Sequence, residues 1–142
     1  MRLIALLVLV LLTAASALGQ TPASRSVPVL VKIDHVFVQA TISGKKALLI
    51  VDTGATTSAF KLAFVPKHDK LDETGVRTAN SVSVNPQVIT DVGIENCGSV
   101  KINALYGDFN FGVADGLLGM DILGKYSSIT LDLKNQRLIL ID

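Results

Sequence analysis

Short runs of β-branched and other apolar residues, interrupted by turn-forming residues, repeat along the chain from Val27 onward. In the segment 35–42, side chains alternate between two faces with a period of two, which is typical of a β-strand. Ser-Gly at 43–44 then marks a tight turn before the apolar run 45–51. The pattern therefore predicts a β-hairpin over 35–51.

The rest of the chain continues this pattern of short strands. Further strands are predicted over 27–33, 82–84, 88–94, 100–105, 128–132 and 137–141. Asn-Pro-Gln at 85–87 is expected to separate the strand 82–84 from the strand 88–94. The segment 67–75 is expected to be a solvated loop. A helical turn is expected within 59–67, where Pro66 limits it, and a short helix over 120–125. Many short strands with one or two short helices predict an all-β, small, closed, barrel-like domain.

Two segments precede this domain. Residues 1–19 have a positive Arg2, an apolar stretch over 3–12 and small residues that offer cleavage after Ala17 or Gly19, which is the pattern of a secretory signal peptide. The apolar stretch is shorter than the ~20 residues that span a bilayer, so we favour cleavage over the alternative, an uncleaved membrane anchor. Residues 20–26 are expected to be a mobile leader, and 27–142 the folded domain, secreted or periplasmic.

Composition narrows the chemistry. The 142 residues are 49% hydrophobic and 18% charged with a net charge of +1, which fits one globular domain and gives no basic surface for nucleic acid. The single cysteine, Cys97, excludes an intrachain disulfide; we interpret it as a buried small hydrophobe rather than an intermolecular bridge. The chain has two histidines, His35 and His68, and we interpret both as structural. The usual zinc site cannot be built from two histidines and one cysteine. No metal and no cofactor are expected.

Asp52 is the residue whose position needs an explanation. It follows the apolar run 47–51 directly and opens the stretch "VDTGATTS". An ionised carboxylate at the end of a buried strand is costly unless it is paired, hydrogen-bonded or protonated. One interpretation is a simple turn, because Asp, Thr and Gly are ordinary turn residues. The other is that the carboxylate is functional.

The stretches "VDTGATTS" and "DGLLGMDILGKY", with the hairpin that follows, resemble the retropepsin-like aspartic proteases over most of the mature chain. The resemblance implies the acid-protease fold and makes Asp52 the catalytic residue. It also implies that the active-site loop contains Thr53, Gly54 and Ala55. The structural support of the site would come from Leu117, Leu118 and Gly119.

The resemblance also implies a homodimer. Two carboxylates about 3 Å apart cannot both ionise and so share a proton, one acting as base and the other as acid. This chain has one such loop, and Asp115, which lies outside an Asp-Thr-Gly sequence, is interpreted as structural. Each subunit would therefore supply one Asp52, with Thr53 hydrogen-bonding across the twofold axis. The apolar segments 27–31 and 138–141 are the predicted interface strands.

Two departures from the family pattern concern the brace of the site and the flap. Retroviral relatives usually carry an acid and an arginine where this chain has Thr56 and Met120, so the dimer loses that brace. The flap is expected over 77–84, with a polar tip at 79–81 in place of two glycines. Residues proposed to line the cleft, besides Gly54 and Ala55, are Thr56, Thr78, Ala79, Asn80 and Ser81. Alanine at position 55 cannot donate a hydrogen bond to the carboxylate, so we expect activity from mildly acidic to near-neutral pH.

These observations predict a secreted or periplasmic aspartic endopeptidase that acts as a homodimer on extended peptide or protein substrates. The alternative is a non-catalytic peptide-binding module that retains the retropepsin fold, since fold alone does not establish function. A third possibility is a monomeric folding or envelope factor.

Overall fold

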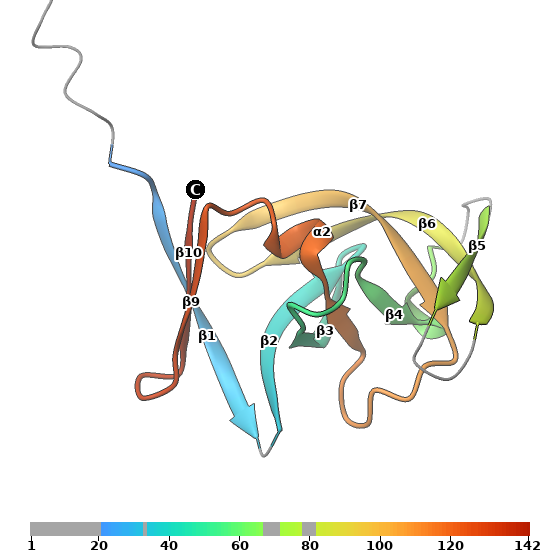
Figure 1. Cartoon of the computed structure of the whole chain (residues 1–142), viewed down its shortest axis with the longest axis horizontal. Coiled ribbons are helices and arrows are strands. Elements are labelled where there is room, and N and C mark those ends of the chain that lie inside the picture. The colour runs from blue at the N-terminus through green and yellow to red at the C-terminus, as the bar shows by residue number, and fades with distance from the viewer. Residues whose placement is uncertain (1–20, 33, 67–71, 78–81) are drawn as a thin grey trace, which may run out of the picture.

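The computed structural model describes residues 21–32, 34–66, 72–77 and 82–142, and most of them lie in strands (Figure 1). The helical elements among them are η2 (Leu62–Phe64) and α2 (Met120–Leu123). The strands are β1 (Ser24–Lys32), β2 (His35–Ile42), β3 (Lys45–Val51), β4 (Ala59–Lys61), β5 (Asp72–Arg77), β6 (Val82–Ile94), β7 (Gly98–Gly107), β8 (Gly116–Leu118), β9 (Ser128–Asp132) and β10 (Arg137–Ile141).

Six of these strands close into a small barrel. In the order β6, β7, β4, β8, β3 and β2, each strand pairs with the next, and β2 pairs back to β6 from Ala40↔Ile94 to Ile42↔Val92. The β3–β8 and β4–β7 pairs are parallel, and the others are antiparallel. A closed barrel of short strands with one short α-helix confirms the predicted fold class.

A second layer of three strands stands beside the barrel (Figure 1). Here β10 pairs with β1 on one side and with β9 on the other, both antiparallel. The later part of β1 pairs with β2 and so connects this layer to the barrel. At the end of the layer, the guanidinium of Arg25 contacts the carboxylate of Asp142 at 2.7 Å, which ties the first strand to the C-terminal residue.

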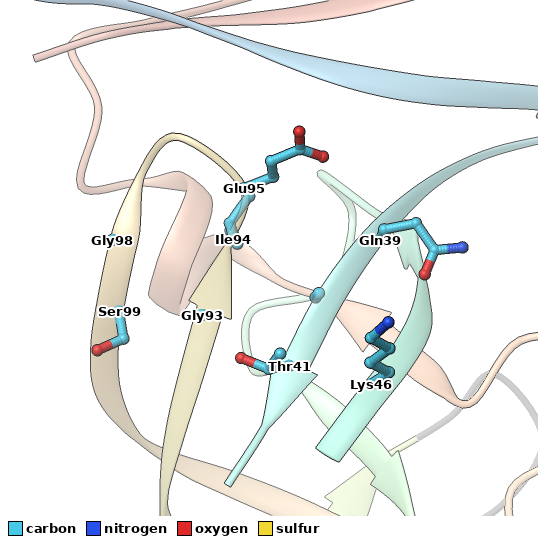
Figure 2. Close-up of a pocket in the computed structure, with 9 residues that line it drawn as sticks. Gln39, Thr41, Lys46, Gly93, Ile94, Glu95, Gly98 and Ser99 are labelled. Atoms are coloured by element: carbon cyan, nitrogen blue, oxygen red, sulfur yellow. The ribbon is translucent and has the colours of Figure 1, made fainter. Parts of the chain in front are cut away.

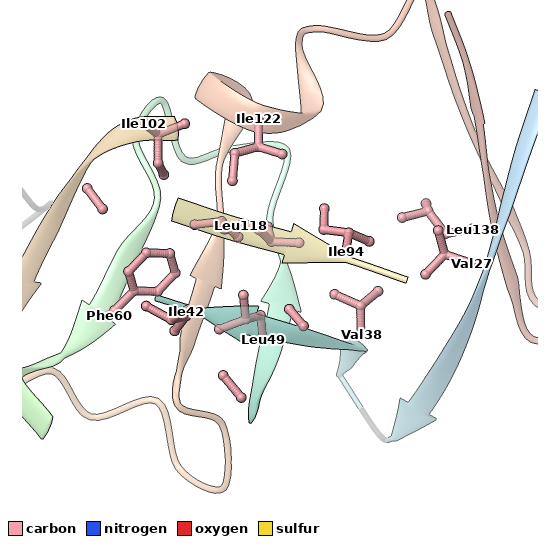
Figure 3. Packing of buried hydrophobic residues seen from close by; sticks show 14 of the residues in the cluster. Val27, Val38, Ile42, Leu49, Phe60, Ile94, Ile102, Leu118, Ile122 and Leu138 are labelled. Atoms are coloured by element: carbon pink, nitrogen blue, oxygen red, sulfur yellow. The ribbon is translucent and has the colours of Figure 1, made fainter. Parts of the chain in front are cut away.

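One apolar core fills the barrel and the space between it and the three-stranded layer. Figure 3 shows Val27 and Leu138, from β1 and β10, on the side of the layer that faces Val38 and Ile94 of the barrel. All four belong to one cluster of buried hydrophobic side chains. Continuity of this cluster holds the two layers together through apolar burial.

The predicted hairpins are observed, but the predicted break at 85–87 is wrong. Strand β6 runs unbroken through Pro86. Proline has no N–H to donate, so a strand tolerates it where one edge is unpaired. Pro86 pairs with Glu73 of β5 only, because the pairing with β7 begins one residue later, at Gln87↔Leu105.

Three further sequence expectations need correction. Residues 72–75, expected in a solvated loop, lie in β5, which pairs with β6 at the edge of the sheet; 67–71, with His68, are outside the described residues. The segment 59–67 begins as a strand, and its helical part is only η2. Residues 24–26, expected in a mobile leader, belong to β1 because β10 gives them a pairing partner.

The strands predicted to form a dimer interface pair with each other inside one chain. Val27 of β1 lies opposite Leu138 of β10, and both are buried in the chain's own core. Since β10 is paired on both sides, its apolar character is explained without a partner. Among the described strands, β9 and β5 are the two at the ends of the strand order.

Within the described ranges, none of the helices has the length and apolar character to cross a membrane.

Candidate active site

Asp52 lies at the end of β3, where the strand leaves the barrel and turns toward β4. Its carboxylate Oδ1 accepts a hydrogen bond from the backbone N–H of Gly54 at 2.8 Å, so the loop itself holds the side chain. Its backbone N–H donates to the carbonyl of Leu118 at 3.0 Å. Asp52 as a whole is half-buried, its hydrogen bond with Gly54 is exposed, and the neighbouring Thr53 and Gly54 are exposed. An acid in this position is fixed by backbone contacts and remains reachable from solvent.

The second predicted motif packs directly against this loop. Strand β8 lies between β3 and β4, parallel to the first and antiparallel to the second, with Val51↔Leu118 and Ala59↔Leu117 in register. Leu118 is fully buried in the core cluster. The segment thus fills the space between the two arms of the loop and fixes their separation.

Gly119 allows this close approach. A Cβ atom at this position would lie 2.8 Å from the carbonyl carbon of Thr57, 2.9 Å from the carbonyl oxygen of Ala55 and 3.0 Å from the nitrogen of Ser58. Backbone atoms at those distances cannot move aside as a flexible side chain would. Only glycine fits here without displacing the active-site loop.

A hollow of about 940 Å³ opens beside Asp52. Its lining includes the apolar Ile50, Val51 and Leu117 from β3 and β8, together with the polar Asp34 and Asn110. Apolar residues and a few polar groups beside a fixed acid are the arrangement expected of a site that binds and acts on an organic substrate.

Two further segments line this hollow, and the sequence analysis did not assign either to the site. One is the loop that contains Phe111 and Val113, the latter 72% exposed, which is a large exposure for a valine. The other is where β1 meets β2: Lys32 ends β1, Asp34 lies in the turn and His35 begins β2. His35 was interpreted as structural; it is exposed, and its ring lies 6.0 Å from that of Phe37. The three apolar residues of "DFNFGV", Phe109, Phe111 and Val113, were the signal in the sequence that could have identified the first segment.

Comparison with known proteins identifies the architecture. A crystal structure of a retropepsin-like aspartic protease from Rickettsia conorii matches this chain with a TM-score of 0.62 and 23% sequence identity, over 87% of this chain and 96% of that chain. The chain has the retropepsin fold. No protein-family model matches the sequence, and no curated protein matches it. The likeness establishes the fold, whereas the chemistry must be argued from the residues.

Within this retropepsin fold, the remaining predicted site residues are placed as follows. Ala55 is half-buried, and its carbonyl accepts a hydrogen bond from the N–H of Met120 at 2.8 Å. Thr56 and Met120 are both exposed. Strands β5 and β6 form a hairpin at the expected place of the flap, with Arg77 opposite Val82. The predicted cleft residue Thr78 and the predicted tip residues Ala79, Asn80 and Ser81 are outside the described residues.

Asp115 is held by the barrel. Its carboxylate Oδ2 accepts a hydrogen bond from the backbone N–H of Leu48 at 2.9 Å, and its own N–H donates to the carbonyl of Leu48 at 2.8 Å. Its carbonyl accepts from the N–H of Lys61 at 2.9 Å. These contacts tie β3 to the start of β8 and agree with the interpretation of Asp115 as structural.

Cys97 lies in the turn between β6 and β7 and is half-buried against the core cluster rather than fully buried. Burial raises the pKa of its thiol, and a hydrogen bond with Tyr126 offsets part of that effect. A thiol with a raised pKa is a poor nucleophile at neutral pH. At neutral pH, less of the Cys97 thiol is therefore ionised than of an exposed cysteine.

A second hollow, of about 520 Å³, shares no lining residue with the first (Figure 2). It lies where β2 meets the end of β6, and its polar lining includes Lys46, Glu95 and Ser99. In the part of the chain that the structure describes, no group of three or more His, Cys, Asp or Glu side chains is arranged to hold a metal ion.

Proposed function

We propose that this protein is an aspartic endopeptidase that acts as a homodimer. One observation carries the proposal: the Asp52 carboxylate is fixed by the Gly54 N–H at the edge of a large hollow lined in part by apolar residues. The retropepsin fold supports it, because the family that the sequence resembles carries its catalytic aspartate on an Asp-Thr-Gly loop.

The proposed chemistry needs two carboxylates and a water. One Asp52 from each subunit would lie close to the twofold axis, and the pair would share one proton. The ionised member takes a proton from the water, which attacks the peptide carbonyl carbon, and the protonated member donates to the carbonyl oxygen. The tetrahedral intermediate then collapses: the C–N bond breaks as the leaving amine takes the proton that the first carboxylate received from the water, and one hydroxyl of the intermediate returns a proton to the second carboxylate, which restores the pair.

The dimer is proposed because one chain supplies one acid on an Asp-Thr-Gly loop; Asp34 also lines the hollow, but it lies in the turn between β1 and β2 and outside such a loop. Asp115 is bonded to Leu48 and is not available as the second member of the pair. Thr53 and Gly54 are exposed, which leaves the tip of the loop accessible to the same loop of a second chain. Among the described strands, β9 pairs with β10 only, so its other edge is available to a partner's strand.

The proposed substrate is a peptide in extended conformation. It would lie along the hollow, with its apolar side chains against Ile50 and Leu117 and under Val113. The residues Gly54, Ala55 and Thr56 would contact its backbone from the loop side. The β5–β6 hairpin would cover it as the flap.

Export is part of the proposal and rests on the sequence of residues 1–19. A positive start, an apolar stretch and small residues before 20 are what a signal peptidase requires. We propose that the mature domain acts in the periplasm or outside the cell.

The experiment that tests the function is cleavage of a denatured protein between about pH 3 and about pH 7, with and without pepstatin, by the wild type and by Asp52→Asn. Loss of general acid–base chemistry is expected to lower the rate by about 10²–10⁴-fold. Cleavage that persists in Asp52→Asn would refute the assignment. Binding of extended peptides without turnover would instead indicate a non-catalytic peptide-binding module.

A further inference from the structure

We propose that Asp121 and Ser58 are positioning residues for the Asp52 loop and set the placement of the catalytic carboxylate within each subunit. This inference rests on the proposed function. Neither residue faces the hollow beside Asp52, and neither contacts the carboxylate of Asp52. They act through the backbone of the loop.

The two residues form a closed set of hydrogen bonds. The Asp121 carboxylate accepts from the Ser58 N–H at 2.9 Å through Oδ2 and from the Ser58 hydroxyl at 2.6 Å through Oδ1. The Ser58 hydroxyl oxygen in turn accepts from the N–H of Gly119 at 2.9 Å. Ser58 is fully buried, so water cannot replace these partners.

These bonds complete a set of contacts that holds the loop at its start, its middle and its end. At the start, the N–H of Asp52 donates to the carbonyl of Leu118, and in the middle the carbonyl of Ala55 accepts from the N–H of Met120. At the end, Ser58 is held by Asp121. Without the last contact, the end of the loop is held by the pairing of β4 with β7 and β8, and its side-chain link to 118–121 is reduced.

A carboxylate suits this position better than a neutral side chain. It accepts two hydrogen bonds from one residue, and charge-assisted hydrogen bonds are shorter and stronger than neutral ones. Asp121 also lies in the first turn of α2, where a negative charge is favourable. In an amide, one of the two acceptor atoms becomes a donor and faces the donor groups of Ser58.

This arrangement supplies a brace that the sequence had appeared to lack. Thr56 and Met120 occupy the positions of the acid and arginine pair of retroviral relatives, and both side chains are exposed. The Asp121–Ser58 contact instead lies inside one subunit, against the core. The loop is therefore placed before a second subunit arrives.

The test uses the full chain with Asp121→Asn and Ser58→Ala, and Asp91→Asn as the matched control, because Asp91 is an exposed carboxylate on β6. Steady-state kinetics across pH are measured beside circular dichroism and sedimentation. We expect kcat to fall about 10- to 100-fold in Asp121→Asn, since small misplacements of catalytic groups have effects of this size. KM should stay within about twofold, because the substrate-lining residues are unchanged.

The pH profile separates positioning from simple stability. If the two carboxylates move apart, their mutual repulsion weakens, so the acidic and basic limbs of the rate profile should approach each other in Asp121→Asn. Ser58→Ala should change both kcat and the profile in the same direction by a smaller amount. The control should match the wild type.

Each other outcome is decisive. Wild-type kcat and pH profile in Asp121→Asn, even with a lower melting temperature, would overturn the inference and leave the proposed function intact. Loss of folding in both variants would assign the pair to stability and would also overturn it. A wild type whose cleavage does not depend on Asp52 would remove the proposed function, and this inference with it.

Discussion

The carboxylate of Asp115 and the backbone of Leu48 are joined by reciprocal hydrogen bonds of 2.9 and 2.8 Å. The carboxylate accepts from the N–H of Leu48, and the N–H of Asp115 donates to the carbonyl of Leu48. This relationship places the chain's other candidate acid in the barrel wall. It has a direct consequence for which aspartates take part in catalysis.

Asp115→Asn should retain activity within about twofold, because the amide oxygen can still accept from Leu48. Asp115→Ala should lower the free energy of unfolding by about 1–3 kcal/mol, since it leaves a backbone donor unsatisfied. Peptide cleavage assays and urea denaturation measure the two effects. A fall of about 10²-fold or more in a folded Asp115→Asn enzyme would place Asp115 in the catalytic pair after all.

The close approach of Gly119 to the active-site loop predicts a local effect of one methyl group. Gly119→Ala should destabilise the fold by about 1–3 kcal/mol and reduce kcat, because its Cβ would press on the backbone of 55–58. Thermal denaturation and cleavage assays measure the two effects.

Gly93→Ala is the matched control for Gly119→Ala. The Cβ atom of this variant would meet the Thr41 hydroxyl at 2.5 Å, but that hydroxyl is at the end of a side chain that can rotate. Gly93→Ala should therefore change the free energy of unfolding and kcat less than Gly119→Ala does. Equal effects of the two variants would show that the loop backbone is not constrained as described.

The Cys97 thiol should react slowly in the folded protein. Burial raises its pKa, so the reactive thiolate is scarcer than in an exposed cysteine at the same pH. At about pH 8, we expect a disulfide reagent to modify the native chain about fivefold or more slowly than the urea-unfolded chain. Equal rates in the two states would contradict the burial effect.

The same shift has a stability consequence. Because the fold raises the pKa of the Cys97 thiol, the protonated thiol favours the folded state. This contribution to stability is fully present below the ordinary pKa of about 8.5, and it is lost as the pH rises through the folded-state pKa. Replacing Cys97 with alanine should therefore flatten the fall of stability in this alkaline range. Urea denaturation of both proteins between about pH 7 and about pH 10 measures the difference.

Ala55 predicts where on the pH scale the enzyme works. Without a hydroxyl at this position, the shared proton of the pair should persist to higher pH, which favours activity from mildly acidic to near-neutral conditions. Ala55→Ser should move the acidic limb of the rate profile to lower pH. A wild-type optimum near pH 2 would contradict this reasoning.

The sequence was sufficient for the parts of the fold that local patterns determine. The closing hairpin was predicted with its observed bounds, Ser128–Asp132 and Arg137–Ile141, because alternating apolar strands flank a polar turn. Pairing with distant strands was not visible locally. Strand β5 has few apolar residues and is a strand through its pairing with β6, and Pro86 fits because one of its edges is unpaired.

The site was predicted to a similar extent. The local stretch around Asp52 identified the acid, and the resemblance paired it with Leu118 and Gly119. The contact of Asp121 with Ser58 joins residues 63 positions apart and could be found only in the folded chain. The fold likewise brings Val113, from the loop before β8, and His35, from the start of β2, to the hollow beside Asp52.

The most direct test of the central claim is a mixing experiment with wild-type and Asp52→Asn chains unfolded together and refolded at equal amounts. If each active site needs one Asp52 from each of two subunits, random pairing leaves about a quarter of the activity of the same total amount of wild-type chain. If each chain carries its own complete site, about half remains. We predict a quarter; a linear dependence of activity on the wild-type fraction would contradict the shared site.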